Sequence, residues 1–180
     1  MLSDSDKRTL LRIAREAIAA RLRAIDRPSV EATGALATLA GAFVTLRRGD
    51  ALRGCIGCVE RERPLADVVA SSAVAAATED PRFLPVEWPE LELVRLEVSV
   101  LGDLEMIDPA DASQLDVGRH GLMIQRGARR GLLLPQVATE CGWDRETFLA
   151  QTCLKAGLSP DAWKSNAQVF RFDAEVFGEE

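Results

Sequence analysis

Histidine and long apolar runs are scarce in this chain of 180 residues. It has one histidine, which limits the side chains suited to proton transfer near neutral pH. No segment approaches the roughly 20 apolar residues that span a bilayer, and the N-terminus has no apolar signal-peptide core. We therefore expect a cytoplasmic protein that has no membrane segment.

The four cysteines lack the spacing of a disulfide or zinc framework. Cys55 and Cys58 form the only close pair, and an extended strand sends residues i and i+3 to opposite faces. A zinc site needs a second ligand pair, whereas Cys141 and Cys153 are typical of core positions in helices. We expect free thiols, no metal and a reducing compartment.

Phosphate-binding and hydrolase motifs are also missing. The chain has no glycine-rich phosphate loop and no Ser-His-Asp pattern, and nothing in it indicates a cofactor. Its net charge of −6 disfavours nucleic-acid binding, which depends on many lysines and arginines. A hydrophobic content of 47% over 180 residues suits a single domain with a sizeable core.

What is present is a distinctive stretch over residues 43–58. It predicts two strands joined at Arg48-Gly49-Asp50, because a Gly-Asp pair supplies the positive φ of a tight turn. Alternation after the turn predicts a core face with Leu52, Ile56 and Cys58 and an opposite face with Arg53 and Cys55.

The face with Arg53 and Cys55 allows two interpretations. An arginine beside a thiol lowers the thiol pKa, and Gly54 and Gly57 add no bulk, which leaves open space above the sulfur. This favours a reactive or ligand-binding cysteine. The alternative is a small buried cysteine beside a solvated arginine.

His120 is the second candidate for chemistry. It lies between Gly118 and Gly121, and glycines let the backbone turn or approach a ligand. Paired with Cys55, it would be the base that activates a nucleophile, with Glu140 as the acid that orients it. Alone, it is an ordinary loop histidine.

Periodicity predicts the other elements. Helical patterns cover residues 4–25, a segment from Pro64 to before Asp80, one from Pro135 and one from Asp144 to Gly157. Alternating patterns predict strands over 93–101, 122–125, 131–134 and 168–176.

The hexapeptide at residues 52–57, Leu-Arg-Gly-Cys-Ile-Gly, resembles the signature of the AMMECR domain family. Other matching blocks follow in order at residues 80–85, 97–101, 118–122, 133–138 with Glu140 and Trp143, and 153–158. The sequence is most similar to the prokaryotic branch called AmmeMemoRadiSam system protein A.

The resemblance implies one AMMECR-like domain over residues 1–180, with two subdomains. Its expected fold is α+β, with a mostly antiparallel sheet of about five or more strands, surrounding helices, and two lobes that form a cleft beside the hexapeptide. It also implies a radical SAM protein and a MEMO-like protein as partners.

Three hypotheses for function remain open. In the first, the chain is an accessory protein that binds these partners at the hexapeptide, with Arg53, Gly54, Gly57 and Glu140 as binding residues. In the second, it is an enzyme in which Cys55 is the nucleophile, His120 the base and Arg53 the anchor of a small anionic substrate. In the third, the hexapeptide is a packing motif in which Arg53 pairs with Glu97 or Asp80.

Overall fold

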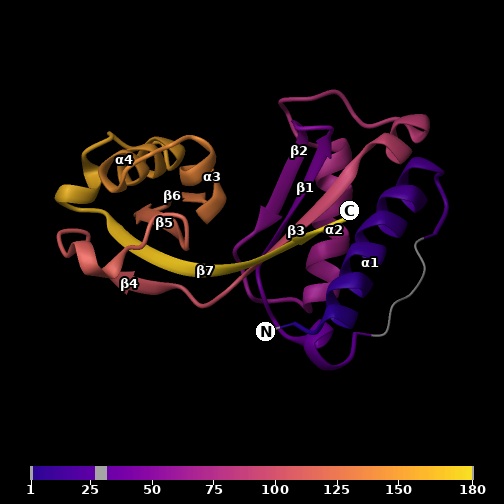
Figure 1. The fold of residues 1–180 in the computed structure, drawn as a ribbon, viewed down its shortest axis with the longest axis horizontal. Coiled ribbons are helices and arrows are strands. Elements are labelled where there is room, and N and C mark those ends of the chain that lie inside the picture. Colours follow the sequence, from indigo (N-terminus) through magenta and orange to yellow (C-terminus); the bar gives the residue numbers. More distant parts are fainter. Residues whose placement is uncertain (1, 27–31, 180) are drawn as a thin grey trace. The chain divides into compact units, whose positions relative to one another are not determined.

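The computed structural model describes residues 2–26 and 32–179 (Figure 1). Its α-helices are α1 (Asp4–Leu22), α2 (Leu65–Thr78), α3 (Pro135–Glu140) and α4 (Arg145–Lys155). Its strands are β1 (Ala42–Arg48), β2 (Ala51–Cys58), β3 (Arg95–Leu101), β4 (Glu105–Ile107), β5 (His120–Arg126), β6 (Arg129–Leu133) and β7 (Gln168–Gly178). The strand order is β2-β1-β3-β7-β5-β6, with β4 also paired to β7. The predicted α+β fold with a mostly antiparallel sheet is confirmed.

The chain divides into two compact units. The first unit contains residues 1–101 and 175–180, and the second contains residues 102–174. Strand β7 belongs to both, because its last residues lie in the first unit and its earlier residues pair with β4 and β5 in the second. The single-domain description and the cleft between two lobes stay predictions.

In the first unit, two helices cover one face of the β2-β1-β3 sheet (Figure 1). Val44 and Leu46 of β1 and Leu96 and Val98 of β3 are fully buried beneath them, as period-2 alternation requires. Helix α1 begins with a capping box in which Ser3 and Asp6 each bind the other's backbone N–H. Several alanines on α2 let it pack closely on the strands.

The predicted hairpin of β1 and β2 is confirmed, and Gly49 at its turn has a φ of +59°. The predicted position of Leu52 on the core face is wrong. The register shifts between Leu46 and Arg47, so Leu52 lies opposite Arg47 and is 37% exposed. A β-bulge adds one residue to a strand and reverses the alternation beyond it, which the sequence pattern does not reveal.

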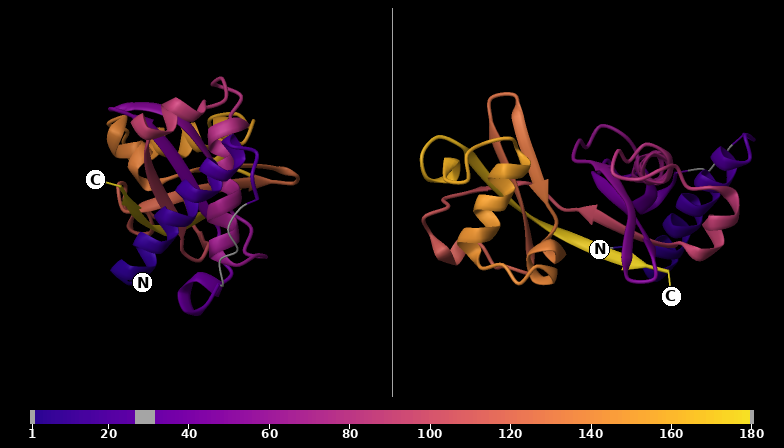
Figure 2. Two further views of the ribbon diagram at one scale, coloured as in Figure 1. Left: turned by 90° about the vertical axis from the view of Figure 1, so that its right-hand side faces the viewer. Right: turned by 90° about the horizontal axis from the view of Figure 1, so that it is seen from above.

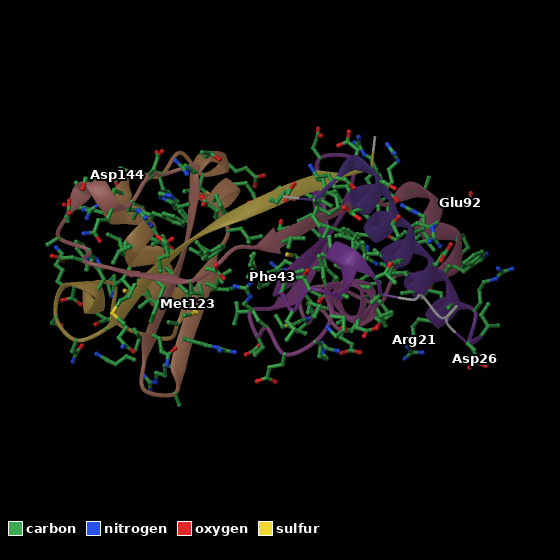
Figure 3. All side chains as sticks on the ribbon, turned by 90° about the horizontal axis from the view of Figure 1, so that it is seen from below. Arg21, Asp26, Phe43, Glu92, Met123 and Asp144 are labelled. Atoms are coloured by element: carbon green, nitrogen blue, oxygen red, sulfur yellow. The ribbon has the colours of Figure 1, made fainter. Side chains whose placement is uncertain are left out.

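In the second unit, α3 and α4 pack against the hairpin of β5 and β6, which is orange in Figure 2. Phe148 and Leu149 of α4 are fully buried in this core beside Leu122 and Ile124 of β5. Asp144, labelled in Figure 3, caps α4 by accepting from the backbone N–H of Thr147.

Several element boundaries differ from the predictions, and one short strand was not predicted. Helix α1 ends at Leu22 rather than at residue 25, and Ala24 has a φ of +53°. Strand β3 begins at Arg95 because residues 88–93 form a 3-10 helix, η2 (Trp88–Leu93). The three-residue strand β4 is too short to show an alternating pattern. Among the described residues, no helix has both the length and the apolar content to cross a membrane.

Candidate functional site

The hexapeptide lies on β2, at the edge of the sheet in the first unit. Cys58 packs towards the core beneath the helices, whereas Cys55 lies opposite Thr45 on the other face. The prediction that the two sulfurs diverge is therefore confirmed. All four cysteines are free thiols.

The backbone of Cys55 is capped by an ion pair from the loop after α2. Its N–H donates to Asp80 Oδ2 at 2.9 Å, and its carbonyl oxygen accepts from Arg82 Nη2 at 3.5 Å. The Arg82 guanidinium also donates to both carboxylate oxygens of Asp80, at 2.9 and 2.7 Å. Together the two side chains satisfy backbone groups that a neighbouring strand would otherwise bind, which protects the open edge of the sheet at this position.

Asp80 is buried, with only 2% of its side chain exposed. Its hydrogen bonds with Arg82 hold the pKa of the carboxyl far below its usual range, and the backbone N–H of Cys55 adds to this effect. In the sequence, residues 80–85 stand out only as a block that resembles the family, and Asp80 only as an alternative partner of Arg53. The sequence signal for the ion pair that caps Cys55 is the spacing of Asp80 and Arg82, which lie two residues apart directly after α2.

The Cys55 thiol is half-buried and accepts a hydrogen bond from the Thr45 hydroxyl, with 3.3 Å between Oγ1 and Sγ. Burial raises the pKa of this thiol. The Thr45 hydrogen bond and the Arg82 charge oppose that rise, while Asp80 and Glu97 add to it. The thiol is therefore protonated at neutral pH, although a nucleophilic cysteine acts as the thiolate.

Arg53 forms a two-point ion pair with Glu90 of η2, at 2.7 Å from Nε and 2.9 Å from Nη2. The predicted pairing of Arg53 with Glu97 or Asp80 is thus wrong, because β1 separates β2 from β3 and places Thr45 between Cys55 and Glu97. Arg53 lowers the pKa of the Glu90 carboxyl through these hydrogen bonds. Glu90 therefore engages Nε and Nη2 of Arg53, while the buried Nη1 has no hydrogen-bond partner among the described residues.

An aromatic ring and an exposed leucine follow Arg82. The Phe83 ring centroid lies 5.4 Å from the Arg82 guanidinium and 5.9 Å from that of Arg53, within cation–π distance of both. The next residue, Leu84, is 84% exposed. We call Cys55, Arg82, Phe83 and Leu84 the Cys55 surface.

The two glycines of the hexapeptide allow close packing. A Cβ at Gly54 would lie 2.1 Å from the Ala76 carbonyl oxygen of α2, and a Cβ at Gly57 would lie 2.5 Å from Cγ of Phe43. The expected open space at Gly57 is therefore wrong, because β1 and the Phe43 ring fill it. Binding of a ligand by either glycine stays a prediction.

His120 and Glu140 both lie in the second unit, while Cys55 lies in the first. His120 Nδ1 accepts from the backbone N–H of Asp116 at 3.0 Å, and Nε2 lies 3.8 Å from Asp173 Oδ1. The acid that faces the imidazole is therefore Asp173, and Glu140 is an exposed residue at the end of α3. The pairing of Cys55 with His120 as nucleophile and base stays a prediction.

The described residues contain no group of three or more histidine, cysteine or acidic side chains that could hold a metal ion. The first unit does have a hollow of about 320 Å³ beside the β1–β2 turn. Arg47, Arg95 and Glu97 contribute charged groups to its wall.

Comparison with known proteins gives one family over nearly the whole chain. A sequence model of AMMECR1 matches residues 11–177. A protein of Methanothermobacter thermautotrophicus is 47% identical over 99% of this chain and 97% of its own length, and protein MK0488 of Methanopyrus kandleri is 46% identical over 95% and 87%. The crystal structure of uncharacterized protein PH0010 from Pyrococcus horikoshii has a TM-score of 0.89 at 42% identity, over 96% of this chain and 90% of that one.

Proposed function

The chain belongs to the AMMECR1 family, and from that premise we propose that it is a noncatalytic accessory protein that binds a radical SAM protein and a MEMO-like protein through the Cys55 surface. The two partners follow from the resemblance of the sequence to the AmmeMemoRadiSam branch. The choice of surface follows from the contacts around the hexapeptide.

One observation carries the proposal. Arg82, which contacts the Cys55 backbone, keeps 51% of its side chain exposed, and Leu84, two residues further along the same loop, is 84% exposed. Arginine and aromatic side chains are enriched in protein interfaces, and the exposed leucine that follows them adds apolar surface for a partner to bury. A protonated, half-buried thiol provides little for nucleophilic chemistry.

The ion pairs at the site support the same function. The carboxylates of Asp80 and Glu90 hold Arg82 and Arg53 in fixed positions, so the loop at residues 82–84 is ordered before a partner arrives. Ordering in advance lowers the entropy cost of association. The loop therefore suits a preformed docking surface.

The alternative function is an enzyme in which Cys55 is the nucleophile. It has support from the Thr45 hydroxyl and the Arg82 charge, both of which favour the thiolate. Because burial is the largest influence on this thiol and acts in the opposite direction, binding is the better-supported function.

The direct test measures binding of the recombinant radical SAM and MEMO-like proteins of the same organism to this chain by biolayer interferometry. Leu84→Ser should weaken binding of at least one partner by tenfold or more, since burial of a leucine side chain contributes about 1.5–3 kcal/mol. Cys55→Ser should keep the Kd within about threefold, because the hydroxyl retains the size and hydrogen bonding of the thiol.

A matched control is Leu39→Ser, which changes another leucine of the first unit that is 49% exposed and lies outside the Cys55 surface. It should bind like the wild type. The proposal fails if the wild type binds neither protein, or if Cys55→Ser abolishes binding while Leu84→Ser has no effect. The second result would favour chemistry at the thiol.

A further inference from the structure

The second unit contains its own hollow, of about 270 Å³, next to the only histidine. The segment before β4, the start of β5 and the middle of β7 form its wall. The lining residues are Gly102, Asp103, Glu105, Arg119, His120, Arg171, Phe172 and Asp173. The backbone N–H of Gly102 donates to the Asp173 carbonyl oxygen at 2.8 Å, which holds two sides of the hollow together.

His120 presents a hydrogen-bond donor to this hollow. Since Nδ1 accepts from the Asp116 N–H, the neutral imidazole carries its proton on Nε2. The nearest acidic oxygen, Asp173 Oδ1, is 3.8 Å from Nε2, which is beyond hydrogen-bond distance. Only 10% of the side chain is exposed, so this donor is held in position, and it has no hydrogen-bond acceptor among the described residues.

Arg119 adds further donors beside the histidine. Its Nε contacts Asp173 Oδ1 at 3.4 Å, and its side chain is 67% exposed. The two terminal nitrogens of its guanidinium have no partner among the described residues. The imidazole N–H and these N–H groups together match the oxygens of a carboxylate, which guanidinium groups bind strongly.

The same hollow also offers acceptors. Arg171 donates twice to Glu105 Oε2, at 2.9 and 2.7 Å, and this leaves Oε1 of Glu105 without a partner in the described part of the chain. Within residues 2–26 and 32–179, the contacts of the Asp173 carboxylate are made by Oδ1, so its Oδ2 is available as well. These two unpaired carboxylate oxygens can accept hydrogen bonds from an ammonium group.

The balance of charge selects between classes of ligand. Two arginines and three carboxylates line the hollow, with a neutral histidine between them, so a dianion would meet net repulsion. A ligand with one negative and one positive group satisfies both sets of free atoms. The volume lies just below the usual range of about 300–1,000 Å³ for ligand pockets, which favours a small molecule.

We propose that this hollow binds a small zwitterion of the free amino acid class, with its carboxylate at His120 and Arg119 and its ammonium group at Glu105 and Asp173. The site lies wholly in the second unit, so it is independent of partner binding at the Cys55 surface.

The single histidine makes the test specific, because its imidazole signals in an NMR spectrum need no assignment among several residues. The full-length protein is titrated at pH 7.5 and constant ionic strength with glycine, acetate or methylammonium, while the His120 signals are followed. Glycine should shift them saturably, and each half-molecule should need at least a tenfold higher concentration for the same shift.

Two arginine variants complete the test, with calorimetry as a second measurement of glycine affinity. Arg119→Ala removes an exposed side chain and should weaken glycine binding about tenfold, or about 1.4 kcal/mol at 25 °C. Arg129→Ala removes an exposed arginine of β6 outside the hollow and should bind as the wild type does. An absent or unsaturable response to glycine, an equal response to acetate, or unchanged affinity in Arg119→Ala would each overturn the proposal.

Discussion

The surroundings of Cys55 and of His120 use the same kinds of side chain with opposite results. Around Cys55, Asp80 binds both Arg82 and the backbone, and Glu90 takes two bonds from Arg53. Around His120, Arg119 makes one long contact to Asp173. The first set of charges fixes a loop, whereas the second leaves donors and acceptors free beside a hollow.

This difference shows that the presence of charged groups does not by itself identify a binding site. A carboxylate whose two oxygens are both engaged, such as that of Asp80, contributes to stability and position. A carboxylate with a free oxygen, such as that of Asp173, can still bind something else. The two regions should therefore respond differently to substitution, the first in stability and the second in ligand affinity.

Asp80→Ala should have the largest effect. It leaves the Cys55 N–H without an acceptor and Arg82 without its partner, and breaking a buried hydrogen-bonded charge pair costs about 3 kcal/mol. Urea unfolding followed by circular dichroism measures the loss. Glu87→Ala, which removes an exposed carboxylate of the neighbouring segment, should change the free energy of unfolding by less than about 0.5 kcal/mol. Equal stability of the two variants would show that Asp80 does not hold this loop.

Gly54→Ala should have the next largest effect, a loss of about 2 kcal/mol. Its Cβ would lie 2.1 Å from the Ala76 carbonyl oxygen, so β2 and α2 must move apart. The control is Gly49→Ala in the turn, where a Cβ meets nothing within 4 Å and only the φ of +59° opposes it, at about 1 kcal/mol. The same unfolding experiment compares them, and a larger loss for Gly49→Ala would contradict the packing role of Gly54.

Much of the fold could be predicted from local patterns. The alternation in β1 and β3, the Gly-Asp turn at Gly49 and the cap at Asp144 each depend on a few neighbouring residues, so the sequence is sufficient for them. The exposed position of Leu52 depends on a bulge in the pairing of two strands, which no local pattern records.

Less of the candidate site could be predicted, because its contacts join distant segments. Cys55 and Arg53 can be identified from the hexapeptide, but the partner of Arg53 is 37 residues away in a 3-10 helix and the cap on Cys55 is 25 residues away. Which of Glu90, Glu97 and Asp80 pairs with Arg53 depends on the order of the strands in the sheet, and the sequence does not give that order. His120 was identified by residue type, whereas the hollow beside it arises only when β4, β5 and β7 come together.

The reactivity of Cys55 should distinguish the two proposed roles of the first unit. In a Cys58→Ala, Cys141→Ser, Cys153→Ala background, the iodoacetamide rate should rise only above the ordinary thiol pKa of about 8.5, because burial raises the pKa of Cys55. Thr45→Val should raise that pKa further by removing the hydroxyl that donates to Sγ.

His120→Ala in the same background separates the enzyme hypothesis from the accessory one. An unchanged rate profile is expected if the thiol and the imidazole act separately. A thiol pKa below 8.5 that rises in His120→Ala would instead support a nucleophile and base, and would contradict the noncatalytic proposal.

The smallest expected effect is in the titration of His120. Burial lowers the pKa of its imidazole below 6.5, and Arg171 and Arg119 act in the same direction, whereas Asp173 and Asp116 oppose them. The folded state therefore favours the neutral ring. Its contribution to stability is complete above the unfolded pKa of about 6.5 and is lost as the pH falls through the lower folded pKa.

NMR titration of the single imidazole measures that pKa directly. Arg119→Ala should raise it and Asp173→Asn should lower it, because each removes one of the charges that act on the ring. Arg129→Ala is the control and should leave it unchanged. If neither Arg119 nor Asp173 moved the pKa, their charges would not act on the ring. That result would contradict the view that the charged groups around His120, unlike those around Cys55, remain free to act on a neighbouring group.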